Sequence, residues 1–205
     1  MRLGRIAACA AAALALCGLA ACGGGTKAGA AAFVGGTRIT DGDVNRYLTV
    51  QSTPYSNGQG QEIRPRVVVL QTLILQQLLE KALAANGGPP SQAELDKVRE
   101  GVLQGATEEQ LTAQITKSNF TESFEPVYLR TQELFALYGL RTRATSADEV
   151  ITSVNNRDIG VQVSPRYGTW DAKQFALQGD ALAPGLSGVL STGAAPTTGA
   201  TPSGS

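Results

Sequence analysis

Residues 65–86 constrain the fold of this chain more than any other stretch, because they are long, helical in pattern and apolar on most sides. Pro65 suits the first position of a helix, where the backbone amide would have no partner. Little polar surface interrupts the segment before Gln76 and Gln77. A helix that is apolar around most of its circumference must be covered by other elements. The sequence therefore predicts a mainly α domain with this helix buried at its centre.

Shorter helices are predicted around the central one from their N-terminal residues. Thr40 can cap a helix whose first turn is acidic, where the helix dipole favours negative charge. Gly87-Gly88-Pro89-Pro90 ends the central helix. Three later pairs have the spacing of a capping box: Ser91 with Glu94, Thr107 with Gln110, and Ser146 with Glu149. We expect the first two of these helices to form an antiparallel arm that packs across a larger element.

A second long helix is predicted over about residues 123–138. Pro126 is tolerated in its first turn, and Gly139 is the expected terminator. Arg141 and Arg143 follow, and we expect them to belong to a solvated helix end.

A small β element is predicted from two parts of the chain. Residues 32–34 and 37–39 flank Gly35-Gly36, a dipeptide that supplies positive φ twice for a tight hairpin turn. Residues 159–164 alternate in strand fashion, and we expect this late strand to pair with the hairpin and close the domain. Arg166, Tyr167 and Trp170 come next, and their simplest interpretation is a corner that packs on the hairpin.

The first 22 residues have the organisation of a lipoprotein signal. Arg2 and Arg5 precede an apolar run at residues 6–19, which is shorter than the ~20 residues of a membrane-spanning helix. Leu19-Ala20-Ala21-Cys22 then matches a bacterial lipobox. We expect a signal peptide at 1–21, lipid on Cys22, a flexible tether at 22–31 and attachment to the extracytoplasmic face of the cell membrane. The alternative is an ordinary secretory signal in which Cys22 is incidental.

The rest of the chain is predicted to be one domain, residues 32–178, followed by a tail. Residues 179–205 are rich in Gly, Ala, Pro, Ser and Thr, with a single charge, so we expect them to be disordered. Loss of the signal peptide removes two arginines and leaves 17 − 2 = 15 basic against 17 acidic residues. This balance does not support nucleic acid as a partner. Cys9 and Cys17 lie in the signal, so no disulfide is expected.

The composition also argues against catalysis. The chain contains no histidine, which excludes Ser-His-Asp and Cys-His arrangements and removes the commonest zinc ligand. The helix dipole accounts for the acidic pairs in predicted first turns: Asp41 with Asp43, Glu108 with Glu109, and Asp148 with Glu149. We therefore expect no enzyme activity, no metal site and no cofactor.

The order of these features resembles the N-terminal chaperone domain of exported foldases of the SurA and PrsA type. Residues 34–40, Val-Gly-Gly-Thr-Arg-Ile-Thr, are followed at once by Asp43-Val44 on a helix. The usual opening of that family is similar: Val-Asn-Gly, two variable residues, Ile-Thr and a helix, so Gly35 replaces an asparagine. The long apolar helix, the capped arm and the helix that begins near Phe124 follow in the same order. The similarity covers roughly residues 31–156, and residues 161–171 resemble the end of small actinobacterial lipoproteins of this group.

The resemblance implies a SurA-like (trigger-factor-like) helical domain that holds unfolded or exported polypeptides. It does not extend to the parvulin prolyl-isomerase domains of those foldases, whose sites use histidines. Only 49 residues follow Asn156, and none is a histidine. The expected function is therefore chaperone-like holding without isomerase activity, with the membrane reached through the lipid anchor. The alternative is an envelope adaptor or structural lipoprotein that binds one specific protein partner.

An aromatic stripe near the second long helix is the candidate substrate-binding surface. Its members are Phe120, Phe124, Tyr128, Phe135 and Tyr138. Aromatic residues at helical spacing usually belong to a core. In the functional alternative, the stripe lines an apolar groove where extended client segments dock without sequence preference.

Overall fold

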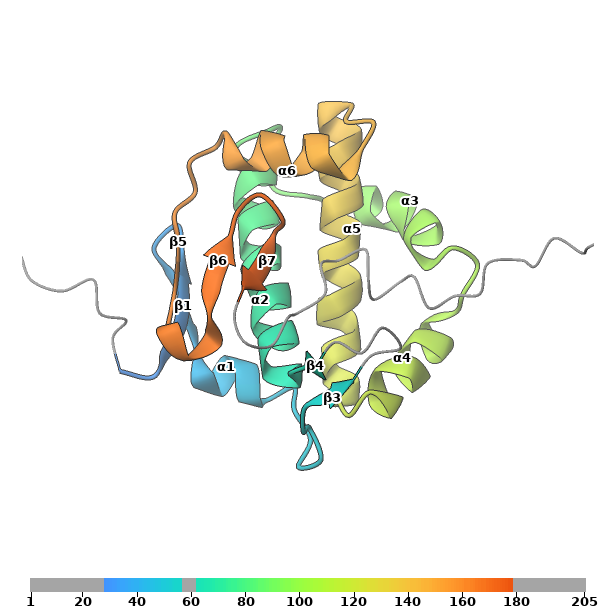
Figure 1. The fold of residues 1–205 in the computed structure, drawn as a ribbon. Helices are drawn as coiled ribbons and strands as arrows, with labels where there is room; N and C mark the ends of the chain where they lie inside the picture. The colour runs from blue at the N-terminus through green and yellow to red at the C-terminus, as the bar shows by residue number, and fades with distance from the viewer. Residues whose placement is uncertain (1–27, 57–61, 179–205) are drawn as a thin grey trace, which may run out of the picture.

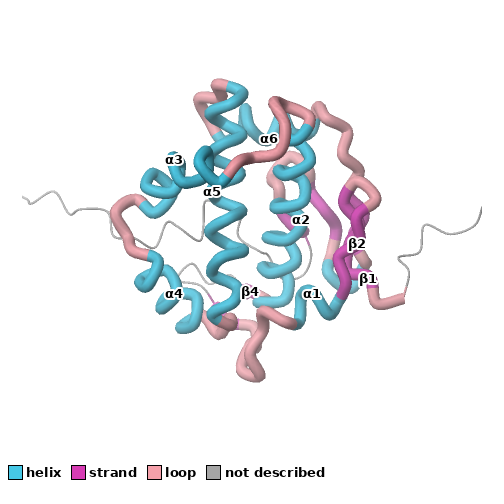
Figure 2. The backbone as a smooth tube through the Cα atoms, turned by 180° about the vertical axis from the view of Figure 1, so that it is seen from behind, coloured by secondary structure: helices cyan, strands magenta, loops and turns pink. Residues whose placement is uncertain are grey.

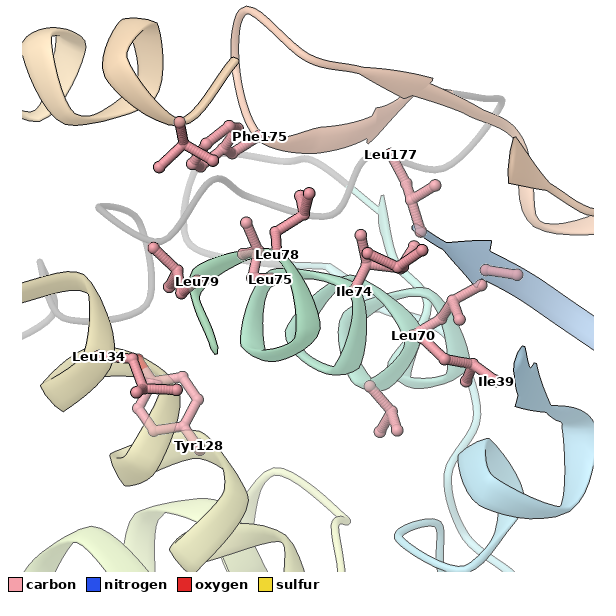
Figure 3. Packing of buried hydrophobic residues seen from close by; sticks show 14 of the residues in the cluster. Ile39, Leu70, Ile74, Leu75, Leu78, Leu79, Tyr128, Leu134, Phe175 and Leu177 are labelled. Carbon is pink, nitrogen blue, oxygen red and sulfur yellow. The ribbon is translucent and has the colours of Figure 1, made fainter. Parts of the chain in front are cut away.

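The computed structural model describes residues 28–56 and 62–178, which form a mainly α domain with small β elements. The predicted central helix is α2 (Pro65–Ala84), with proline at its start. Among the described helices, α2 is the one long and apolar enough to cross a membrane, but most of that stretch is buried inside the domain. Figure 3 shows Leu70, Ile74, Leu75 and Leu79 of this helix surrounded by side chains from other elements. It is therefore the core helix, as predicted.

The other helices follow the predicted order along the chain. α1 (Asp41–Asn45) precedes α2, and α3 (Gln92–Leu103) with α4 (Glu108–Lys117) forms the arm. The short 3-10 helix η1 (Glu122–Phe124) leads into α5 (Glu125–Thr142), and α6 (Ala147–Asn155) packs against the end of α5. Figures 1 and 2 both show α2 and α5 side by side, with the arm beyond α5.

The predicted hairpin and late strand form a three-stranded sheet. β1 (Ala30–Val34) and β2 (Thr37–Thr40) pair antiparallel through Gly35 and Gly36, whose φ values of +51° and +82° suit a two-residue hairpin turn. β5 (Val161–Val163) pairs antiparallel with β1, which gives the strand order β2-β1-β5. The predicted closure of the domain by a late strand is confirmed.

The domain begins slightly earlier than predicted. Ala30 and Ala31 belong to β1 and are almost completely buried, so they are not part of a flexible tether. The predicted signal peptide, Cys22, most of the tether and the predicted tail at 179–205 lie outside the described residues.

Two short hairpins have no counterpart in the sequence prediction. β3 (Tyr55–Ser56) pairs with β4 (Glu62–Ile63), and β6 (Thr169–Asp171) pairs with β7 (Ala176–Gln178). Strands of two or three residues are too short to show a periodicity. The second hairpin nevertheless matters for the core, because Phe175 and Leu177 are buried over α2 (Figure 3).

Most of the predicted helix starts are confirmed. Thr40, Ser91 and Thr107 each form a complete capping box at the start of α1, α3 and α4. The third predicted box is only half formed, because Ser146 accepts from the Glu149 amide but the Glu149 carboxylate accepts from the Thr145 amide instead.

The predicted end of the second long helix is wrong. α5 continues through Gly139 to Thr142, and the C-cap residue Arg143 adopts a left-handed conformation with φ of +57°. Gly139 faces α6, where a Cβ atom would lie 3.4 Å from Val150. The glycine therefore permits close packing between the two helices and does not terminate α5.

The prediction of a solvated Arg141 is also wrong. Its side chain is only 15% exposed and forms a forked pair with Glu94 of α3, with Nη2 2.8 and 2.9 Å from the two carboxylate oxygens. Nη1 donates to the carbonyls of Asn86 and Gly88, just beyond α2. One side chain thus joins the C-terminal end of α2, the start of α3 and α5.

Candidate functional site

The aromatic stripe that was the predicted docking surface belongs to the hydrophobic core. Phe120, Phe124, Tyr128 and Tyr138 are each at most 5% exposed, and Phe135 is partly buried against the same cluster. Phe120 stacks on Phe124 with ring centroids 4.9 Å apart. Burial raises the pKa of the Tyr128 hydroxyl. The core interpretation is therefore correct, and these rings do not line an open groove.

The surface between the arm and α5 carries several charged side chains and none of the predicted aromatic residues. A hollow of about 650 Å³ lies between α4 and the start of α5. Its charged lining consists of Glu108, Glu109, Glu122 and Glu125 with Lys117, and no aromatic ring of the described residues contributes to it. Burial raises the pKa of Glu125, and the nearby carboxylates act in the same direction.

The outer edge of the sheet offers a different candidate. β5 is an edge strand, and its pairing with β1 is fixed in part by the Gly35 amide, which donates to the Gly160 carbonyl at 2.8 Å. Backbone groups alternate in direction along an antiparallel strand, so those of Val161 and Val163 point away from β1. Among the described residues they have no hydrogen-bond partner. Such an edge can accept another strand.

This edge opens onto a hollow of about 630 Å³, which we call the β5 groove. Its walls come from the start of α2, from β5, from the 3-10 turn η2 (Pro165–Tyr167) and from the β6–β7 hairpin. Val161, Val163 and Trp170 provide partly exposed apolar surface. The charged side chains of the described residues that line the groove are cationic: Arg64, Arg66 and Arg166.

Two of these arginines already have carboxylate partners. Arg166 Nη2 donates to Asp41 at 2.5 Å, and Arg64 Nε donates to Glu62 at 3.2 Å. Arg66 lies exposed in the first turn of α2 and has no ion-pair partner among the described residues. The positive end of the α2 dipole adds to the same potential. The groove therefore carries positive charge that the described carboxylates do not neutralise.

The predicted corner of Arg166 and Tyr167 forms one wall of the groove. The Tyr167 hydroxyl donates to Asp41 Oδ1 at 2.8 Å, and Arg166 donates to the carbonyl of Ala30 at 3.0 Å. Burial, with a contribution from Asp41, raises the pKa of Tyr167. Trp170 packs instead on Phe175, with ring centroids 6.1 Å apart. The expected packing of this corner on the hairpin is confirmed for Arg166, whereas Tyr167 bonds to the start of α1.

The acidic pairs weighed as catalytic or metal-binding groups have structural partners or lie exposed at helix starts. Asp41 accepts hydrogen bonds from Arg166 and Tyr167. Asp43 completes the capping box of α1, where hydrogen bonds from Thr40 lower the pKa of the Asp43 carboxyl. Glu109 is exposed in the first turn of α4. Across residues 28–56 and 62–178, no group of three or more Cys, Asp or Glu side chains could hold a metal ion.

No sequence pattern marks Arg64 and Arg66 as site residues. They flank Pro65 at a predicted helix start, where a charged side chain usually faces solvent. Their role depends on the approach of β5 and β6, which lie far away in the sequence. The alternation of residues 159–164 was the available signal for the strand, but it does not say which edge stays unpaired.

Comparisons with known proteins do not assign this site. The chain matches no family model, and no curated protein or solved structure shows significant similarity to it.

Proposed function

We propose that this protein is a lipoprotein of the cell envelope whose SurA-like domain holds unfolded or exported polypeptides at the membrane, without prolyl isomerase activity. The observation that carries the proposal is the unpaired edge of β5 beside an open groove. An extended chain adds to such an edge through main-chain hydrogen bonds, which do not depend on its sequence. This mode of binding allows one site to hold many different chains.

The connectivity of the domain supports the SurA-like interpretation. An N-terminal hairpin, a long apolar helix, a two-helix arm and a second long helix are followed by a strand that returns to β1. This is the order that the sequence resemblance implies. The lipid anchor is proposed from Cys22 and the residues before it, and the absence of isomerase activity from the lack of histidine.

A second candidate function is an envelope adaptor that binds one partner. The three arginines of the β5 groove favour it, because charged walls discriminate among segments of different charge. The two functions differ in the range of polypeptides that the protein would bind. A holding module acts on many unfolded chains, whereas an adaptor acts on one.

The direct test is light scattering from an aggregating, unrelated client protein in the presence of the Cys22→Ser chain that starts at residue 22. Suppression at near-stoichiometric ratios is the expected result. If several unrelated clients aggregate as fast as in buffer, the general holding function is wrong and the adaptor is favoured. For the anchor, a labelled fatty acid should enter the wild-type protein but not the Cys22→Ser variant.

A matched pair of variants at Val163 connects the activity to the strand edge. Val163→Pro removes the outward amide but leaves the bonds between β5 and β1, since proline is tolerated where its nitrogen faces away from the sheet. Val163→Thr keeps both the amide and the shape of the side chain. We expect the proline variant to lose suppression and the threonine variant to keep it, with circular dichroism confirming that both are folded. Equal suppression by the two variants would place the holding surface elsewhere.

A further inference from the structure

The geometry of β5 determines which side chains of an added strand would face the groove. Val161 and Val163 lie on one face of the strand and line the groove, whereas Gln162 is exposed on the other face. An added strand alternates in the same way, so every second side chain would enter the space between β5 and α2. The remaining side chains would face solvent beside Gln162.

The walls of the groove then set the chemistry of those inward side chains. Among the lining residues, Trp170 offers partly exposed aromatic surface, and Val67 is buried in the first turn of α2. Arg66 presents a guanidinium that is not engaged by a described carboxylate, with Arg64 two residues before it. No acidic side chain from the described part of the chain lines the groove. The walls thus complement an apolar side chain and a carboxylate at alternate positions.

We infer that the β5 groove selects extended acidic segments, in which an Asp or Glu two residues from an apolar residue is bound by Arg66 while the main chain pairs with β5. This inference rests on the proposed function, because it names the class of polypeptide that the holding site prefers. Arg64 and Arg166 contribute less, since each already pairs with a carboxylate of its own domain. Arg66, which has no ion-pair partner among the described residues, therefore determines the preference for acidic segments.

An anionic bilayer surface is the other ligand that could attract these arginines, but it fits the geometry less well. A lipid headgroup would satisfy the charge of Arg66 but would leave the backbone groups of Val161 and Val163 unpaired. A polypeptide satisfies both. The positive surface is also part of a groove walled by four elements, whereas membrane-binding basic segments usually lie exposed.

The experiment uses Trp170 as the reporter, because it is the only tryptophan in the chain and lies in the groove. The full-length protein, purified in detergent, is titrated with ten-residue peptides that lack tryptophan. Thr occupies every second position of these peptides, and Val and Glu take turns at the positions between. Companion peptides carry Gln or Lys in place of Glu. A fourth peptide keeps the Glu side chains but has N-methyl groups on alternate residues, which removes the donors needed for strand pairing.

We expect a saturable change in Trp170 fluorescence, with the Glu peptide binding about tenfold more tightly than the Gln peptide, as for a charge-assisted bond at a partly exposed site. The Lys and N-methyl peptides should bind more weakly still. In Arg66→Glu, the preference should reverse so that the Lys peptide binds best. The matched control is Lys97→Glu, the same charge change at an exposed position on α3, a helix that α2 and α5 separate from β5 and β6 (Figure 1). It should leave all affinities unchanged.

Three results would overturn the inference: equal affinity for the Glu, Gln and Lys peptides, an unchanged preference in Arg66→Glu, or full binding of the N-methyl peptide. A fluorescence change with phosphatidylglycerol vesicles that depends on Arg66, without peptide binding, would assign the groove to lipid headgroups instead. The light-scattering assay separates this inference from the proposed function. Suppression of aggregation without a charge preference rejects the acidic class alone, whereas selective peptide binding without suppression of any client supports the acidic class and rejects general holding.

Discussion

The buried ion pair between α3 and α5 leads to a quantitative prediction about stability. The Glu133 side chain is 2% exposed, and Arg99 Nε donates to its carboxylate at 2.6 Å. Arg99 also contacts Glu108, but that carboxylate is 49% exposed. Replacement of Arg99 by methionine keeps much of the apolar stem and removes the guanidinium. It therefore leaves the Glu133 carboxylate buried without its cation.

The magnitude follows from the burial of each partner. Removal of one member of a buried pair typically costs about 3–5 kcal/mol, because the other charge stays desolvated. Arg99 is 35% exposed, so some water reaches the pair and the lower end applies. The exposed contact with Glu108 adds at most about 1 kcal/mol. We expect Arg99→Met to lower the free energy of unfolding by about 3 kcal/mol. The double variant Arg99→Met/Glu133→Leu should recover most of this loss, since no buried charge remains at this pair.

Urea unfolding followed by circular dichroism measures the free energy of unfolding of both variants and of the wild-type protein. A single-variant loss below about 1 kcal/mol, or a double variant no more stable than the single one, would refute the argument.

Three further predictions concern two glycines and the ion pair at the start of α3. Gly101 lies exposed inside α3, and a methyl group there would meet no other part of the described domain within 4 Å, so Gly101→Ala should stabilise the domain by about 1 kcal/mol and raise its melting temperature by about 3 °C. Gly35→Ala should lower that temperature, because φ is +51° and Lys81 would lie 3.0 Å from the new Cβ. Bonds from Ser91 and from Arg141 lower the pKa of Glu94 to about 2. The ionised Glu94 carboxylate therefore stabilises the folded domain fully above its ordinary pKa of 4.5, and this stabilisation is lost as the pH falls towards 2. Arg141→Met removes one cause of the lowered pKa, so the stability of this variant should depend less on pH over that range.

The sequence predicted correctly the features that depend on residues close together in the chain. The apolar circumference of α2, the Gly35-Gly36 turn and the capping residues act over a few positions, and each has the predicted structure. The alternation of residues 159–164 located a strand, although only Val161–Val163 pair with β1.

Predictions failed where a distant element decides the outcome. Gly139 can end a helix, but the packing of α6 keeps it helical. Arg141 lies in the last turn of α5, and its partner Glu94 is 47 residues away in the sequence. The aromatic residues of the stripe have the same spacing whether they line a groove or fill a core, and only the position of α2 and the arm distinguishes the two cases. The same is true of the β5 groove, because Arg66 and Val163 are far apart in the sequence and line one groove only in the folded domain.

The position of the β5 groove also explains how a short edge could hold a client. Arg166, which lines the groove, donates to the carbonyl of Ala30, the first residue of β1. Residue 30 follows residue 22 by eight positions, so a fully extended connection spans at most about 28 Å. A lipid on Cys22, as proposed, would therefore hold the groove within about 30 Å of the bilayer. Under the proposed function, a chain emerging from the membrane would meet the groove at a high effective concentration. A three-residue edge, and one arginine without an ion-pair partner among the described residues, would then need to supply only modest affinity to hold a client transiently.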